Sequence, residues 1–149
     1  MPEIQVKYDS YSVMLNAPFR KAIDGDAGID LYNSSCKDII ISPGHSVMVP
    51  AGISVKIPKD HCALVYPRSS AFHKKGLFVV PGLIDSGYTG SIFTIVWYPN
   101  INGVERPMII SPWERLSQLL ILPIPQIDIK IVNELPITTR GSKGFGSTG

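Results

Sequence analysis

Gly82-Leu83-Ile84-Asp85-Ser86-Gly87-Tyr88-Thr89-Gly90 is the stretch on which the fold prediction depends. Its three glycines allow the backbone to bend sharply and to come close to a ligand. The flanking runs Leu77–Val80 and Ser91–Tyr98 have the composition of strands, and Pro81-Gly82 fits a type II turn with glycine in the left-handed position. We therefore predict a β-hairpin with an aspartate and a tyrosine ring at one end. Taken alone, the same residues also describe a plain turn with an exposed Asp85 and a half-buried tyrosine.

Short β-rich runs recur along the rest of the chain. The 13 prolines and 13 glycines between them exclude long helices. Many short strands with turn signals about every 8–12 residues are typical of a β-sandwich or barrel, so the predicted fold class is all-β. Alternation of apolar and polar residues marks half-buried strands, most clearly in the last run. Besides the two strands of the hairpin, the predicted strands are Ile4–Tyr8, Ile39–Ile41, Ser46–Val49, Ile53–Ile57, Cys62–Tyr66, Met108–Ile110, Leu119–Leu122 and Ile127–Val132.

Size and composition exclude several classes of protein. A chain of 149 residues suffices for one domain and buries about 68–70% of its unfolded surface, so its core needs no disulfide or metal. The net charge of +2 does not indicate a nucleic-acid or membrane surface. No apolar run reaches the roughly 18 residues of a membrane span. Cys36 and Cys62 lack metal-site spacing and no secretory segment is evident, so we expect reduced thiols in a cytosol-like compartment.

The first candidate site is the acidic stretch Asp24–Tyr32. Three acids in seven residues could bind a cation, but the spacing is not that of an EF-hand loop. Asp24-Gly25 is more simply a turn. Asp30 lies between Ile29 and Leu31 on a predicted strand, where an acid usually faces solvent.

The second candidate is Pro67–Gly76. Ser69 or Ser70 can cap a short helix that Gly76 ends, and this is the one helix predicted. The helix start would combine unpaired N–H groups with Arg68 and two hydroxyls, which suits an anion. An ordinary capped helical turn explains the residues equally well.

Two segments near the C-terminus carry further polar groups. In Trp113–Leu119, Arg115 could pair with a carboxylate, although a structural role is favoured, and Gln118 can donate to a phosphate oxygen or to the backbone. The tail Arg140–Gly149 matches the glycine spacing of a dinucleotide-binding loop but lacks the strand before it and the helix after it, and it is no P-loop. Such a tail cannot pack by itself, yet its cations, hydroxyls and ring suit closure over a phosphorylated planar ligand.

Five motifs together resemble the homotrimeric deoxyuridine triphosphatase (dUTPase) family. In chain order they are AGIDLY (27–32), PRSS (67–70), GLIDSGYTG (82–90), ERLSQL (114–119) and RGSKGFGSTG (140–149). The resemblance implies a jelly-roll-like β-barrel or sandwich at residues 1–139 and a mobile tail at 140–149 that closes over the active site. It also implies a homotrimer with sites at subunit interfaces, which hydrolyses dUTP to dUMP and pyrophosphate with Mg²⁺. That reaction keeps uracil out of DNA and supplies dUMP for thymidylate synthesis.

The resemblance also assigns roles to individual residues. Asp85 would activate the water that attacks the α-phosphorus, and Asp30 would support Mg²⁺ through water while the substrate phosphates hold most of the metal. Phe145 would stack on uracil, and Tyr88 would exclude a 2′-hydroxyl. Arg140 would reach the γ-phosphate. The full set of implied substrate contacts is Arg68, Ser69, Ser70, Gly82, Ile84, Tyr88, Gln118, Arg140, Gly144, Phe145, Gly146, Ser147 and Thr148.

Four positions depart from the family pattern, and they bear on specificity and rate more than on the reaction. Ser70 and Trp113 stand where glycine is usual, Ser117 replaces an alanine, and Val79 replaces a polar residue. We expect a cytoplasmic enzyme (nuclear, or in the host cytoplasm for a viral or phage protein) without a nucleic-acid or membrane partner.

Two alternatives remain open from the sequence. A related dCTP deaminase would need a glutamate on the strand after the hairpin, where this chain has Ile95. A non-catalytic nucleotide sensor or partner-binding module would be expected to lack part of the catalytic set, which is complete here. A regulatory protein partner in addition to catalysis is compatible with these residues, and the sequence names none.

Overall fold

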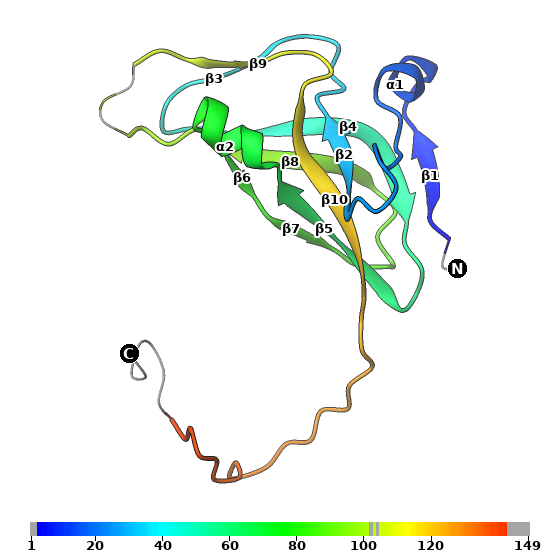
Figure 1. Cartoon of the computed structure of the whole chain (residues 1–149), viewed down its shortest axis with the longest axis vertical. Coiled ribbons are helices and arrows are strands. Elements are labelled where there is room, and N and C mark those ends of the chain that lie inside the picture. The colour runs from blue at the N-terminus through cyan, green and yellow to red at the C-terminus, as the bar shows by residue number, and fades with distance from the viewer. Residues whose placement is uncertain (1–2, 102, 104, 143–149) are drawn as a thin grey trace.

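Two four-stranded antiparallel sheets form the body of the molecule in the computed structural model, which describes residues 3–101, 103 and 105–142 (Figure 1). The first sheet has the strand order β1-β4-β8-β6 and the second has the order β2-β10-β5-β7, while β3 and β9 form a separate two-stranded ribbon. This is the predicted all-β jelly-roll-like sandwich. The strands are β1 (Gln5–Tyr8), β2 (Gly28–Tyr32), β3 (Ile39–Ile41), β4 (Ser46–Lys56), β5 (His61–Pro67), β6 (Phe78–Val80), β7 (Gly82–Ile84), β8 (Ser91–Trp97), β9 (Met108–Ile110) and β10 (Arg115–Pro123).

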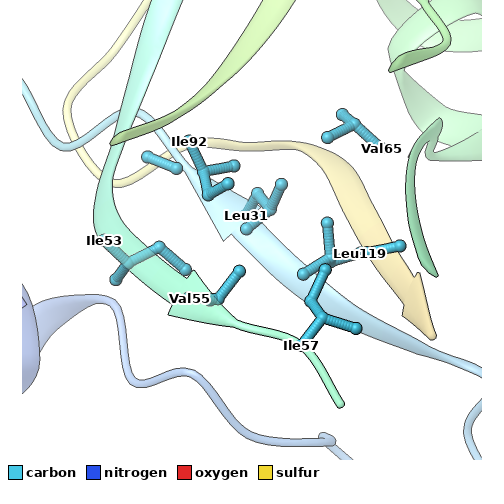
Figure 2. Packing of buried hydrophobic residues seen from close by; sticks show 9 residues of the cluster. Leu31, Ile53, Val55, Ile57, Val65, Ile92 and Leu119 are labelled. Carbon is cyan, nitrogen blue, oxygen red and sulfur yellow. The ribbon is translucent and has the colours of Figure 1, made fainter. Parts of the chain in front are cut away.

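The main core lies between the two sheets, where side chains from both inner faces meet. Figure 2 shows Ile53 and Val55 of β4 packed with Leu31 of β2 and Leu119 of β10. Leu119 is fully buried, and removing a side chain of this size from water contributes about 1.5–3 kcal/mol. A second buried cluster joins α2 (Ser69–Lys75) and the β3–β9 ribbon to the same body. The β2-β10-β5-β7 sheet is therefore stabilised on its inner face by the main core, and the second cluster stabilises the end of the sandwich near α2.

One long strand replaces two predicted short ones. The predicted runs Ser46–Val49 and Ile53–Ile57 belong to β4, which pairs with β8 through its first half and with β1 through its second. The pairing register shifts between Pro50 and Ser54, and Gly52 at this point has a φ of +71°. A Cβ at Gly52 would overlap the Ser34 side chain, so the bulge requires glycine. Pro50 and Gly52, which suggested a break between two strands, instead lie at a bend within β4.

The helix prediction was half right. α2 ends at Gly76 with a left-handed φ of 64°, as expected, but its N-cap is Arg68, and neither serine caps it. A second helix, α1 (Tyr11–Asn16), was missed. The Ser10 hydroxyl accepts a hydrogen bond from the Val13 N–H and is the only local signal for it. Neither helix is long enough to cross a membrane in the part of the chain that the structure describes.

Two further predictions were wrong. Gly82 does not have the positive φ that a type II turn requires. It is the first residue of β7, which pairs with β5. At Pro81-Gly82 the chain therefore crosses from one sheet to the other instead of forming a type II turn. Ile127–Val132 forms no strand. After β10 the described chain runs away from the body as an arm (Figure 1), on which Ile129 and Ile131 are 87% and 93% exposed. The alternation is real, but no strand among the described residues pairs with it.

Candidate functional site

A cavity of about 360 Å³ lies between β2, β10 and the start of α2. β2 contributes Asp30, β10 contributes Gln118, and the chain entering α2 contributes Arg68 and Ser69. These four residues come from three of the motifs that the sequence singled out, and the structure brings them together. Arg115 lines the same cavity.

Asp30 is at the centre of the charged groups. Its side chain is only 11% exposed, and its two carboxylate oxygens accept from different arginines. Arg68 Nη1 donates to Oδ1, and Arg115 Nη1 donates to Oδ2 at 3.3 Å. The solvent-facing alternative for Asp30 is therefore wrong. Arg115, whose carboxylate partner could not be read from the sequence, is thereby placed in the site.

Arg68 is the most strongly perturbed cation of this group. Burial lowers the pKa of Arg68 below its usual value, the neighbouring Arg115 lowers it further, and Asp26 acts in the opposite direction. An arginine keeps its charge at neutral pH in spite of such a shift. Two crowded guanidiniums thus make the cavity favourable for an anion with several oxygens.

Gln118 is held across the cavity by the backbone. Its Nε2 donates to the Pro67 carbonyl at 3.3 Å, which joins β10 to the approach of α2. A Cβ on Gly28 would collide with the Gln118 amide, so the glycine of the first motif is needed for this side chain to lie where it does. Sequence reasoning missed that role, and the glycine before Ile29-Asp30 was the available signal.

The acidic segment before β2 behaves as a turn. Gly25 has a φ of +94°, as the Asp24-Gly25 prediction requires. Asp26 lines the cavity and accepts from the Ile23 N–H at 2.9 Å. No group of three or more His, Cys, Asp or Glu side chains that could hold a metal is found among the described residues.

Asp85 lies in a different cavity. Gly82, Ile84, Asp85 and Tyr88 line a hollow of about 230 Å³ against β8. β7, which leads into Asp85, and β2, which carries Asp30, are the opposite edges of one four-stranded sheet, roughly 14 Å apart at three strand spacings. The structure of a single chain therefore does not bring Asp85 together with Asp30 and Arg68.

Hydrogen bonds fix the turn between β7 and β8, which carries Asp85 and Tyr88. The Tyr88 hydroxyl donates to the Ser91 carbonyl at 2.9 Å, and the Tyr88 N–H donates to the Asp85 carbonyl at 3.0 Å. Gly90 leaves room for the Tyr88 ring, which a Cβ would meet. Tyr88 is 46% exposed, which agrees with the half-buried tyrosine of the plain-turn alternative.

The remaining predicted residues are divided between a second cavity and the tail. Ser70 does not line the Asp30 cavity but a neighbouring one, on the other side of Arg68 and Arg115. Arg140 lies in the exposed arm. Gly144, Phe145, Gly146, Ser147 and Thr148 lie outside the residues that the structure describes.

The fold and the Asp30 cavity define a class: jelly-roll proteins with a charged pocket beside a short helix. Comparison with known proteins narrows the class, because the dUTPase family model matches residues 17–149. The chain belongs to the dUTPase family. The deoxyuridine 5′-triphosphate nucleotidohydrolase of Polynucleobacter asymbioticus is 39% identical over 128 residues, which cover 84% of this chain and 83% of the relative.

Solved structures agree with this assignment. The dUTPase of Staphylococcus bacteriophage 80alpha with dUpNHpp is 26% identical and superposes with a TM-score of 0.81 over 99% of this chain and 98% of its own. A mutant dUTPase of S. aureus phage phi11, which coordinates a structural Mg(II) ion, has the same fold at 23% identity, with a TM-score of 0.75 over 89% of this chain and 97% of its own.

Proposed function

We propose that this protein hydrolyses dUTP to dUMP and pyrophosphate, and so limits uracil in DNA and supplies dUMP for thymidylate synthesis. The observation that carries the proposal is the convergence of Asp30, Arg68, Ser69 and Gln118 on one cavity in a chain of the dUTPase family. Arg68 and Gln118 offer fixed N–H donors for the oxygens of a triphosphate, and Ser69 adds a hydroxyl. Positioning and charge neutralisation supply most of the catalysis in reactions of this kind.

In the reaction, a water oxygen forms a bond to the α-phosphorus and the bond from that phosphorus to the α–β bridging oxygen breaks. Asp85 takes the proton of the attacking water as the general base. Arg68 and Ser69 stabilise the charge that develops on the departing pyrophosphate. The tail 140–149 closes over the nucleotide, with Phe145 on the uracil ring.

Mg²⁺ is the cofactor that this residue set fits. Mg²⁺ takes one or two carboxylates and completes its coordination with phosphates and water, and the cavity offers the carboxylates of Asp30 and Asp26 without a dedicated metal cage. When bound, the ion would neutralise phosphate charge and fix the conformation of the triphosphate. Asp30 would support it through water.

A complete site requires more than one chain, and we propose the homotrimer. The two halves of the catalytic set lie in separate cavities of one chain, as sites at subunit interfaces would require. The outward face of β8 and its neighbours in the sheet is apolar where a single chain exposes it to water, which is typical of a subunit interface. The exposed residues of this face are Met48, Phe78, Val80, Phe93, Ile95 and Trp97.

The deaminase alternative loses support at the same place. Ile95 lines the Asp85 cavity, where a deaminase would need a glutamate to transfer protons, and an aliphatic side chain cannot do so.

Both cysteines, Cys36 and Cys62, are free thiols, which agrees with a cytoplasmic protein.

Two experiments test the proposal. The first measures pyrophosphate release from dUTP, dCTP, dTTP and dATP with and without Mg²⁺; we expect release from dUTP with Mg²⁺ only, and no ammonia from dCTP. Failure to cleave dUTP in magnesium buffer contradicts the proposed function.

The second experiment tests the shared site. Asp85→Asn and Arg68→Ala chains, each inactive alone, are unfolded together and reassembled. If a site takes Asp85 from one chain and Arg68 from another, about a quarter of the sites in a 1:1 mixture are intact by random combination, and activity returns. A mixture as inactive as its parents, with mixed trimers shown by native mass spectrometry, contradicts the interface site.

A further inference from the structure

A second, larger cavity lies beside the candidate site, and two of its lining residues, Lys75 and Glu114, have no role in the proposed reaction. It measures about 430 Å³ and lies between α2 and the loop that leads into β10. Arg68 and Arg115 line both this cavity and the one around Asp30, so these two side chains separate them. Lys75 and Glu114 form the far side.

Lys75 ties the end of α2 to the segment between β9 and β10. Its Nζ donates to the Ile109 carbonyl at 2.9 Å and lies 2.6 Å and 2.7 Å from the two carboxylate oxygens of Glu114. Glu114 also accepts from the Ser111 N–H at 3.0 Å. Both side chains are largely shielded from water, at 30% and 21% exposure, which makes this pair stronger than an ordinary surface ion pair.

The backbone next to Glu114 adopts a conformation that needs such support. Trp113 has a φ of +61°, which a bulky residue rarely adopts. The Trp113 N–H donates to the Asn33 carbonyl at 2.8 Å, and the Asn33 N–H donates to the Glu114 carbonyl at 2.9 Å. The fully buried Asn33 side chain donates to the Ile110 and Ser111 carbonyls at 3.1 Å each. Strained backbone persists where its surroundings fix it, and here those surroundings are Asn33 and the Lys75–Glu114 pair.

Arg115 follows Trp113 and Glu114 directly in the chain, so the conformation of their backbone determines where its side chain starts. β10 begins at Arg115, and its register against β2 shifts between Arg115 and Ser117. That bulge lets Arg115 reach Asp30, although Asp30 pairs with Gln118 in the sheet. The Arg115 side chain is 51% exposed, so its direction depends largely on the backbone that carries it.

We propose that Lys75, acting through Glu114, is a positioning residue that holds Arg115 on Asp30. This inference rests on the proposed function, because the consequence of a misplaced Arg115 is a poorly oriented Asp30 during dUTP hydrolysis. Supporting contacts behind the residues that orient a metal's surroundings are commonly worth 10–100-fold in activity.

The test compares Lys75→Ala, Glu114→Gln, their double variant and the conservative Lys75→Arg. We expect Lys75→Ala and Glu114→Gln each to lower kcat about 10-fold with KM for dUTP within about twofold, the double variant to fall no further than either single one, and Lys75→Arg to recover most of the rate. Lys74→Ala is the matched control: it removes the same charge from the same turn of α2, but the Lys74 side chain forms no ion pair or hydrogen bond with any described residue.

A second readout is independent of activity. In NMR spectra of arginine-labelled protein, assigned with Arg115→Lys, the Arg115 Nε–H signal should be dispersed in the unsubstituted protein and in Lys74→Ala, and should collapse toward free-arginine values in Lys75→Ala. An unchanged signal, a Lys75→Ala variant with full kcat, or an equal loss in Lys74→Ala overturns the proposal. Should the unsubstituted protein not cleave dUTP, the proposed function fails while the signal still decides the role of Lys75.

Discussion

The buried contact between Thr94 and Ser117 permits a quantitative prediction about stability. Thr94 lies on β8 and Ser117 on β10, so the contact joins the two sheets across the core. The two hydroxyl oxygens are 2.6 Å apart, and the residues are 3% and 0% exposed. Thr94 is the group that satisfies the Ser117 hydroxyl.

Ser117→Ala should therefore destabilise the protein. It leaves the Thr94 hydroxyl buried without a partner among the described residues, which costs about 1–3 kcal/mol. For a chain of this size, 1 kcal/mol lowers the melting temperature by roughly 2–4 °C. Thr94→Val should lower the free energy of unfolding by a similar amount, because it leaves the Ser117 hydroxyl without its hydrogen-bond partner. The double variant Thr94→Val/Ser117→Ala replaces both polar groups with apolar ones of similar shape and should lie within about 0.5 kcal/mol of the original protein.

The assay is guanidinium unfolding followed by tryptophan fluorescence, at one fixed protein concentration because assembly makes stability depend on concentration. The decisive quantity is the coupling energy from the double-mutant cycle, expected at about 2–6 kcal/mol because the double variant should avoid nearly all of the two single losses. A neutral Ser117→Ala, or a double variant whose loss equals the sum of the two single losses, would refute the reasoning. Pyrophosphate release should be unchanged in the double variant, since neither hydroxyl lines the candidate site.

Three further predictions concern the site. Asp85→Asn should lower turnover by about 10²–10⁴-fold while the analogue dUpNHpp still binds in calorimetry, and a variant with full rate would remove the general-base role. Gly28→Ala places a methyl group against the Gln118 amide and should lower kcat/KM for dUTP by about 10- to 100-fold without unfolding the protein, whereas an unchanged kcat/KM would show that Gln118 does not contact substrate. Phe145→Ala should weaken dUpNHpp binding by about 1–3 kcal/mol, and equal affinity would exclude stacking.

The sequence predicted the strands best where turn residues bound them on both sides. Ile39–Ile41 and Met108–Ile110 have the predicted bounds. The prediction placed the start of β10 four residues late, at Leu119 instead of Arg115, because a register shift near Ser117 breaks the alternation. The run Ile127–Val132 has the pattern of a strand but pairs with no strand in the part of the chain that the structure describes. A pattern alone does not reveal where a partner strand lies.

The candidate site was predicted in parts and not as a whole. Asp30, Arg68, Ser69 and Gln118 meet because β2 and β10 are neighbours in one sheet and α2 begins beside them. Sequence order does not reveal that β7 is at the far edge of that sheet, so the separation of Asp85 was not predicted. The partners of Arg115 and Lys75 depend on a bulge and a left-handed backbone, for which the bulky Trp113 gives no signal in the sequence.

Asp30 binds two guanidiniums at once, and this limits which ions the cavity retains. The carboxylate already offsets part of the positive charge of Arg68 and Arg115, so an oxygen that binds either guanidinium competes with Asp30 for that charge. Chloride offers each guanidinium no more than Asp30 does, whereas a triphosphate brings several oxygens and a higher charge to both. The carboxylate thereby favours anions of high charge over monovalent ones.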